Sequence, residues 1–356
     1  AAPSAQPPEL TDTHITDKSK IHKDMMITNI ALLVVSLAMI IYGANWLTEG
    51  GSGVAKRFGL SEMIIGLTIV AFGTSAPELV ISVMSAIKGN AGLAIGNVVG
   101  SNIANVLLII GVVAMVRPIK IDNSVMSNEI PLMILSSVAL LACGNSELLD
   151  GLPNTVTRVD GIMLLLFFMV FMRYTFSQAK KSPAPIHDGS GTATATAGDT
   201  EIPKPSKLWK SIALIAVGLA ALVWGGNIFV DSASALAASI GVSEAVIGLT
   251  VVALGTSLPE LATSVVAAVK GHPGLAVGNV IGSCLFNILF VLGVSATISP
   301  LQMGEIDNFD LLTMTGSAVL FWIAGWLIGD RVITRGEGAL FTALYIAYTV
   351  ILVLQS

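Results

Sequence analysis

The chain contains an internal duplication that lies in strongly apolar sequence. Residues 66–111 read GLTIVAFGTSAPELVISVMSAIKGNAGLAIGNVVGSNIANVLLIIG, and residues 248–293 read GLTVVALGTSLPELATSVVAAVKGHPGLAVGNVIGSCLFNILFVLG. Aligned without a gap at a constant offset of 182, the two segments are identical at 27 of 46 positions. The duplication predicts two related halves, and each copy places one carboxylate, Glu78 or Glu260, directly after a proline.

Composition places these halves in a membrane. Of the 356 residues, 54% are hydrophobic and 12% are charged, whereas soluble domains carry about 25% charged residues. The mean hydropathy is +0.82, and helices of roughly 20 apolar residues are long enough to cross about 30 Å of hydrocarbon. We therefore expect an all-α integral membrane protein in a lipid bilayer. A net charge of -5 without a basic run argues against nucleic-acid binding.

About ten transmembrane helices are predicted, five before a central polar stretch and five after it. An odd number of spans then separates equivalent positions, so the second half crosses the membrane in the opposite direction. Such halves are inverted-topology repeats. The predicted helices are 27–48, 61–88, 91–116, 125–144, 158–176, 209–240, 243–270, 273–298, 307–328 and 336–354.

Four regions follow from this pattern. Residues 1–26 form a polar N-terminal tail that we expect to be disordered, and residues 27–176 form the first five-helix repeat. Residues 177–208 form a flexible linker with a low-complexity run, and residues 209–356 form the second repeat. With the tail outside, the odd-numbered loops hold 13 of the 18 basic residues. The positive-inside rule then predicts a cytoplasmic linker in a multi-pass protein of the cell (inner) membrane.

The motifs GTSAPE and GTSLPE predict broken helices 2 and 7. Pro77 and Pro259 lack the N–H that a continuing helix would donate. Backbone groups freed at membrane depth are tolerated where they line a cavity or bind a ligand. We therefore expect a polar site at each break.

Glu78 and Glu260 follow these breaks and need partners. An acidic residue at the centre of a transmembrane helix costs roughly 2.5–3.5 kcal/mol, and no apolar segment holds a lysine or arginine to pair with either. Inverted symmetry would bring both carboxylates together, where one divalent or two monovalent ions would neutralise them. Calcium takes six to eight oxygen ligands, which the carboxylates, freed carbonyls and the amides of Asn105 and Asn287 would supply. The alternative is a kinked helix with a buried, protonated glutamate and no ligand.

Other polar residues have simpler interpretations beside functional ones. Asn97 and Asn279 lie in Gly-Asn-x-x-Gly patterns, which are typical of close helix packing, so we expect them to bond between helices. Glu62 and Glu244 each follow a serine at a helix start, which favours capping. Four further residues are either ion ligands or interhelical hydrogen-bonding groups: Ser101, Asn105, Ser283 and Asn287.

Soft ligands and catalytic groups are scarce. All four histidines fall in the tail or in predicted loops, and the two cysteines lack a CxxC spacing. A zinc site or a disulfide framework is therefore not expected. No Ser-His or Cys-His arrangement falls in the predicted spans, so we expect a protein that is not an enzyme and has no cofactor.

The paired motifs GTSAPEL with GNVVGSNIANVLLIIG, and GTSLPEL with GNVIGSCLFNILFVLG, closely resemble the alpha repeats of the sodium/calcium exchanger family within the calcium/cation antiporters. The chain is similar to a short prokaryotic-type member without a large regulatory loop. The resemblance implies that Glu78 and Glu260 are ligands shared by calcium and sodium. It also implies further ion ligands, namely backbone oxygens of Thr74 and Thr256, carbonyls of Ala71 and Ala253, side chains of Ser101 and Ser283, and the central Asn105 and Asn287.

The resemblance implies a secondary antiporter that exchanges Ca²⁺ for Na⁺ by alternating access. Asn287 departs from relatives that carry Asp there, which argues against potassium co-transport, and Cys284 opposite Asn102 is a second departure. Calcium/proton antiport is the alternative, since protons can neutralise the same glutamates, but Ser101 and Ser283 would be of no use to a proton. A passive cation channel is a further alternative, which the inverted repeats and broken helices disfavour.

Overall fold

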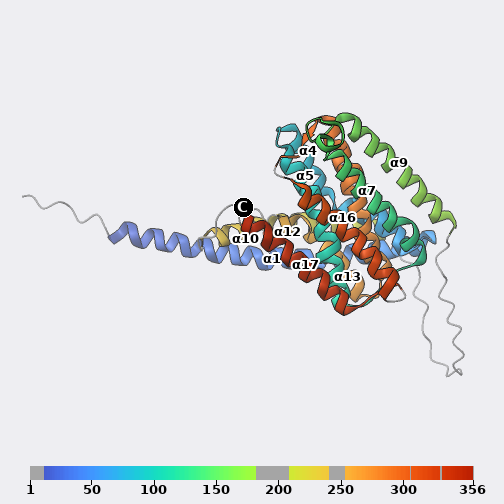
Figure 1. Cartoon of the computed structure of the whole chain (residues 1–356). Coiled ribbons are helices and arrows are strands. Elements are labelled where there is room, and N and C mark those ends of the chain that lie inside the picture. Colours follow the sequence, from blue (N-terminus) through green and yellow to red (C-terminus); the bar gives the residue numbers. More distant parts are fainter. Residues whose placement is uncertain (1–11, 182–207, 240–252, 305, 329–330, 356) are drawn as a thin grey trace, which may run out of the picture.

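The computed structural model describes residues 12–181, 208–239, 253–304, 306–328 and 331–355 (Figure 1). Nearly all of these residues are helical, as predicted. The helices of the first half include short π-helical segments, labelled η, and two strands. They are α1 (Asp12–Phe58), α2 (Glu62–Ile65), η1 (Gly66–Val70), α3 (Ala71–Thr74), α4 (Ala76–Ile87), α5 (Ala91–Ile103), η2 (Ala104–Ile109), α6 (Ile110–Val116), β1 (Ile119–Lys120), η3 (Val125–Glu129), α7 (Ile130–Cys143), α8 (Ser146–Asp150), β2 (Thr155–Val156) and α9 (Arg158–Lys181).

The second half repeats this order. Its elements are α10 (Leu208–Ser239), α12 (Ala253–Thr256), α13 (Leu258–Val269), α14 (Pro273–Phe286), η5 (Asn287–Leu292), α15 (Gly293–Ile298), β3 (Leu301–Gln302), α16 (Asn308–Ile323), η6 (Ala324–Ile328), β4 (Val332–Ile333) and α17 (Arg335–Gln355). Two short antiparallel ladders join the halves. Strand β1 pairs with β4, and β2 pairs with β3, so each ladder takes one strand from each half.

Helix α1 is longer than the sequence predicts. It begins at Asp12, inside the segment expected to be a disordered tail, so that expectation is wrong from Asp12 onward. The prolines of the tail all lie at positions 3, 7 and 8. Between Asp12 and the first apolar turn there is no proline or glycine to end the helix. Residues 1–11 and most of the predicted linker, 182–207, lie outside the described residues.

Eight helices in the described part of the chain are long and apolar enough to cross a membrane, and the bent pair Glu62–Thr74 with Ala76–Ile87 gives a ninth. The predicted helix 243–270 overlaps residues 240–252, which the structure does not describe. Elements α12 and α13 account for the remainder of that helix. The count of ten spans and the inverted orientation of the halves therefore stay predictions.

The centre of the molecule is formed by the helices that carry the duplicated motifs. In the most apolar stretch of Pro273–Ile298, 94% of residues are buried within the protein, and in Ala91–Val116 the figure is 78%. A Cβ added to Gly278 would lie 2.5 Å from the Met63 carbonyl oxygen. This crossing confirms the packing seam predicted for Gly278, because only glycine lets the backbones approach so closely.

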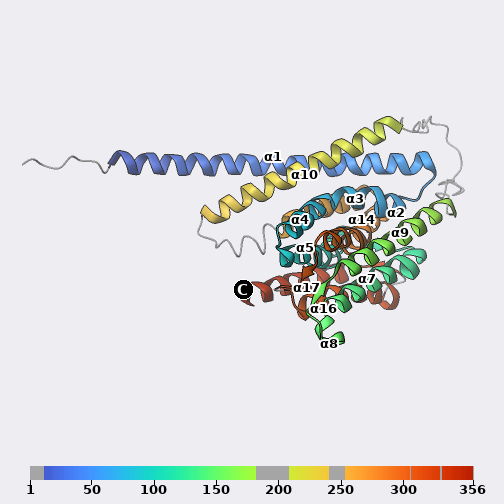
Figure 2. The ribbon, with the colours of Figure 1, turned by 90° about the horizontal axis from the view of Figure 1, so that it is seen from above.

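Helices α1 and α10 form a separate pair that crosses over the remaining bundle (Figure 2). Only 11% of the apolar window of α1 is buried within the protein. The two helices meet at glycines, since a Cβ on Gly43 would lie 2.9 Å from the Gly218 carbonyl oxygen and one on Gly218 would lie 2.7 Å from the Leu47 nitrogen. Further close contacts at Gly50 and Gly225 continue along the pair, while most of the apolar window of α1 faces outward.

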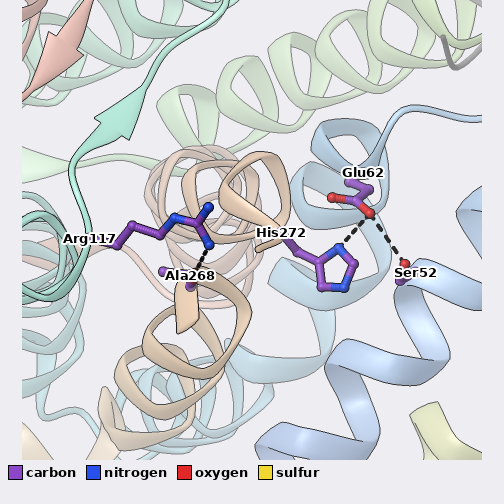
Figure 3. A network of polar contacts seen from close by, with 5 residues as sticks. All are labelled: Ser52, Glu62, Arg117, Ala268 and His272. Carbon is purple, nitrogen blue, oxygen red and sulfur yellow. Dashed lines mark hydrogen bonds and ion pairs between the residues drawn. The ribbon is translucent and has the colours of Figure 1, made fainter. Parts of the chain in front are cut away.

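A polar network ties α1 to the start of the broken span, α2, and to the turn before α14 (Figure 3). Ser61 caps α2 through its bond from the Ile64 nitrogen, which confirms a capped helix start. The neighbouring Glu62 accepts a 3.2 Å bond from Ser52 of α1 and contacts His272 Nδ1 at 2.7 Å. Glu62 thus joins α1, α2 and the turn before α14. The equivalent Glu244 lies outside the described residues.

Candidate ion-binding site

The duplicated Pro-Glu motifs break their helices, as predicted. Helix α3 ends at Thr74 and α4 begins at Ala76, and the two parts of this span are bent by 47°. In the second half, α12 ends at Thr256 and α13 begins at Leu258. Each glutamate therefore lies in the first turn of a new helix, where the positive end of the helix dipole favours negative charge.

Glu78 and Glu260 are both buried, with 1% of each residue exposed. Their carboxyl groups lie near enough to interact electrostatically. In the described residues the single ion pair joins His272 to Glu62, so neither carboxylate has a cationic partner. The structure thus brings the two predicted acids together without protein charge to balance them.

Each carboxylate accepts a hydrogen bond from a serine of its own half. Ser101 Oγ donates to Glu78 Oε1 over 3.5 Å, and Ser283 Oγ donates to Glu260 Oε1 over 3.4 Å. These serines lie on α5 and α14, at equivalent positions of the duplication. Ser101 and Ser283 were predicted as ligands or interhelical groups, and the structure places both directly against the glutamates.

Each carboxylate is also contacted from the opposite half. Ser75 Oγ, at the break before α4, donates to Glu260 Oε1 over 3.1 Å. The Thr74 side chain also interacts with Glu260, and the Thr256 side chain interacts with Glu78. The helix break of one half therefore contacts the glutamate of the other, and the site lies at the interface of the halves.

Two asparagines support the backbone of the broken helices. Asn97 Nδ2 donates to the Glu78 carbonyl oxygen at 3.2 Å and to Ser82 at 2.9 Å. Asn279 Nδ2 donates to the Glu260 carbonyl oxygen at 3.3 Å and to Ser264 at 3.0 Å. The predicted interhelical role of Asn97 and Asn279 is confirmed. These bonds fix where each half-helix starts and so where each carboxylate points.

The central amides Asn105 and Asn287 are almost fully buried, each with 1% exposed. Asn287 Nδ2 donates to Asn102 Oδ1 over 3.1 Å, and Asn102 Nδ2 donates to the Cys284 carbonyl oxygen over 3.2 Å. Asn105 interacts with the Cys284 side chain. Both amides therefore contact a residue of the opposite half, Asn287 through its nitrogen and Asn105 at the Cys284 side chain.

Several buried oxygens have no hydrogen-bond partner among the described residues. Among the site residues these are Glu78 Oε2, Glu260 Oε2, Asn105 Oδ1 and Asn287 Oδ1. Buried polar groups are normally paired, and each exception requires an explanation. Two carboxylates and two amides each keep one free acceptor, and a cation or a proton satisfies such oxygens.

The unpaired acceptor atoms of the site are oxygens. In the described ranges there is no group of three or more His, Cys, Asp or Glu residues placed to hold a metal ion. Oxygen ligands suit hard cations such as calcium and sodium. Donors of this type are compatible with reversible binding.

The remaining predicted ligands are backbone groups at the breaks. Ala71 is buried, and its carbonyl oxygen accepts from the Ser75 nitrogen over 3.0 Å. Ala253 is the first residue of α12. Ser75 and Asn102 contact the site but were not predicted to do so. The contact of Ser75 could have been predicted, because Ser75 and Ser257 occupy matching positions in the duplicated motif.

Comparisons with known proteins agree with this geometry. The sequence model of the family described as sodium/calcium exchanger protein matches residues 28–177 and 210–354. The inner membrane protein YrbG of Escherichia coli is 36% identical over 92% of this chain and 97% of its own length. The sodium/calcium exchanger MaX1 of Methanosarcina acetivorans is 31% identical over 92% of this chain and 99% of its own length.

A solved structure supports the same conclusion. The sodium-calcium exchanger NCX_Mj, soaked with Na⁺ and Sr²⁺, superposes with a TM-score of 0.75 and 30% sequence identity, covering 90% of this chain and 97% of that protein. The family transports Na⁺ and Ca²⁺ across membranes, and its members are not enzymes. The chain is a multi-pass membrane cation antiporter that belongs to the sodium/calcium exchanger family.

Proposed function

We propose that the chain exchanges Ca²⁺ for Na⁺ across the cell (inner) membrane by alternating access, with Glu78 and Glu260 as ligands shared by both ions. One observation carries this proposal. Four buried acceptor oxygens, contributed by both halves, lack a protein partner. Leaving a buried acceptor unpaired costs about 1–3 kcal/mol, and more when it is charged, so a bound cation would satisfy all four.

Calcium fits the charge and the donors of this site. Two carboxylates carry a formal charge of -2, which one Ca²⁺ neutralises. Calcium accepts six to eight oxygens in flexible geometry. The four free oxygens supply part of this shell, and we assign the remainder to backbone oxygens of Thr74 and Thr256, which flank the breaks. The site requires no further cofactor.

Sodium would use the same glutamates together with neighbouring oxygens. We assign the flanking sodium positions to the carbonyls of Ala71 and Ala253 and to the hydroxyls of Ser101 and Ser283. Each serine already contacts its glutamate, so an ion at the serine would also reach the carboxylate. Calcium and sodium would then compete for the same carboxylates, which is the condition for exchange.

Charge compensation provides the coupling. An empty site would hold two uncompensated carboxylates in a dry protein interior, where charges are expensive unless paired. A loaded site would be close to neutral and could pass the barrier between the two sides of the membrane. Only loaded forms would therefore cross readily. If three sodium ions exchange for one calcium, each cycle moves one net charge, worth about 2.3 kcal/mol per 100 mV.

The moving part in this proposal is the pair α1 and α10. This pair crosses over the bundle and is joined internally at Gly43 and Gly218. Most of the apolar window of α1 faces outward, whereas the motif helices are enclosed. Sliding of α1 and α10 over a fixed centre would open the site to one side and then to the other.

Reconstituted protein tests the proposal. Proteoliposomes are loaded with calcium, and an inward sodium gradient or a pH gradient is imposed separately. We expect calcium release with the sodium gradient and none with the pH gradient alone. Release driven only by protons would replace the sodium assignment with calcium/proton antiport. Release that needs neither gradient, and that saturates poorly, would indicate a channel.

A further inference from the structure

The structure assigns a positioning role to Asn102, which we propose fixes the direction of the Asn287 amide so that its oxygen faces the ion site. This inference rests on the proposed function, because it treats Asn287 as an ion ligand. Asn102 lies on α5, three residues before Asn105, and is 2% exposed. Its counterpart at the offset of 182 is Cys284.

The Cys284 carbonyl oxygen can only accept hydrogen bonds. Asn102 bonds to it over 3.2 Å, so the Asn102 amide must present its nitrogen there. Its oxygen therefore points to its other partner.

That other partner is Asn287. The Asn102 oxygen accepts, so Asn287 must present its own nitrogen to it, and the structure shows this bond at 3.1 Å. The oxygen of Asn287 is consequently directed elsewhere, and it is one of the four free acceptors. The Cys284 carbonyl oxygen thus fixes the orientation of the Asn102 amide, and the Asn102 amide in turn fixes the orientation of the Asn287 amide.

Reversal of the Asn287 amide would be costly in this arrangement. It would place two oxygens, those of Asn102 and Asn287, against each other, and it would put N–H donors where Asn287 now keeps a free oxygen. N–H donors would occupy space that the carboxylates keep for a cation. Asn102 therefore makes Asn287 a neutral oxygen ligand.

The two halves differ at this point. Asn105, the counterpart of Asn287, contacts the Cys284 side chain instead of an amide. A thiol is a weak donor and a weak acceptor, so it holds an amide less firmly and imposes little polarity. The duplication hence contains one firmly directed amide, Asn287, and one loosely held amide, Asn105.

A double-mutant cycle tests the assignment. The variants are Asn102→Leu, Asn287→Leu and the two combined, with Cys284→Ala as the counterpart change. The readout is sodium-driven calcium flux in proteoliposomes, analysed as separate KM and kcat values. Loss of a buried, directed hydrogen bond predicts a rise in the calcium KM of roughly tenfold for Asn102→Leu. The kcat should change less than the KM.

The double variant should be no worse than Asn287→Leu alone, because Asn102 acts only through Asn287. Cys284→Ala should raise the KM less than Asn102→Leu does. Additive effects of the two leucine substitutions would overturn the assignment, as would equal effects of Asn102→Leu and Cys284→Ala, which would indicate packing alone.

Two controls separate the possible failures. If Asn102→Leu does not elute as a single species, Asn102→Ala replaces it in the same cycle, since it removes both bonds without adding volume. Glu78→Gln is measured in parallel. Loss of flux in Glu78→Gln with no KM change in the Asn102 variants would refute only the positioning role. Normal flux in Glu78→Gln would refute the proposed site itself.

Discussion

The two halves of the site share a framework but differ in how they hold individual oxygens. The asparagines that support the broken helices, Asn97 and Asn279, make equivalent bonds, and so do Ser101 and Ser283. The halves diverge at single positions. Ser75 bonds to the opposite glutamate, while the Ser257 hydroxyl has no partner within the described part of the chain. The repeated residues build the site, and contacts that differ between the halves, even those of matched serines, set how each oxygen is held.

The largest expected effect tests whether the halves contribute equally. Glu78→Gln and Glu260→Gln each remove one of the two negative charges, so each should lower calcium transport by about a hundredfold or more, in line with loss of a buried charge partner. Sodium-driven flux in proteoliposomes measures this.

A buried acid outside the site provides the matched control for these variants. Glu129 is also a buried acid, bonded to Tyr174 on a different helix pair. Glu129→Gln should keep most of the activity. Comparable losses of transport in all three variants would show that transport depends on any buried acid. That result would contradict the assignment of Glu78 and Glu260 as the ion ligands.

The supporting asparagines should affect stability, and unequally. Removal of a buried amide leaves its partners unpaired at a cost of about 1–3 kcal/mol. Asn279→Ala should lie toward the upper end and Asn97→Ala toward the lower end, because Asn279 is fully buried and also accepts a bond from Thr74.

Thermal unfolding in detergent, without calcium or sodium, measures this difference. Omitting the ions separates the effect on the fold from the effect on binding. If Asn97→Ala were the more destabilising of the two, the ranking by burial and bond number would be incorrect.

The serines at the breaks should separate the halves in transport. Ser75→Ala removes a bond to Glu260, and a bond to a charged group is worth about 1.5–3 kcal/mol. Because solvent or an ion takes over part of that contact, we expect the calcium KM to rise roughly three- to tenfold. Ser257→Ala should change it less, since Ser257 makes no bond to Glu78. A larger effect of Ser257→Ala would mean that its free hydroxyl is itself a ligand.

The smallest effect concerns an asymmetry between the turns that precede α5 and α14. His272 pairs with Glu62, whereas the equivalent position in the first half is Asn90. The pair is partly exposed, so its contribution should be below about 1 kcal/mol and should decrease with added salt. His272→Asn, which copies the first half, is tested by thermal unfolding at two salt concentrations. A salt-independent loss would point to packing of the imidazole instead of its charge.

Sequence patterns predict the framework of this site because the framework depends on residue type. Proline at 77 and 259 lacks the backbone N–H that a continuing helix would need, so the chain begins a new helix there, and a carboxylate in apolar sequence demands a partner. Glycine at 278 predicts close packing because it has no side chain to keep the neighbouring backbone away. The confirmed bond of Asn279 follows from its place in that seam. Around Asn97 the predicted close packing is not seen at Gly100, where an added Cβ would have nothing within 4 Å.

Other features depend on three-dimensional contacts that no local pattern records. The free oxygen of Asn287 follows from a bond to Asn102, which itself follows from a carbonyl of the opposite half. Ser75 reaches Glu260 from the other half of the chain, 185 residues away. The helical start of α1 was missed because the polar composition of residues 12–24 suggested disorder, although nothing in that stretch terminates a helix.

Equilibrium calcium binding in the presence of sodium tests the central claim most directly. Purified protein in detergent is titrated with radioactive calcium at increasing sodium concentrations, alongside the double variant Glu78→Gln/Glu260→Gln. We expect saturable binding that sodium displaces in the unaltered protein and no specific binding in the double variant. Calcium binding by the double variant equal to that of the unaltered protein, or binding that sodium does not displace, would contradict the account.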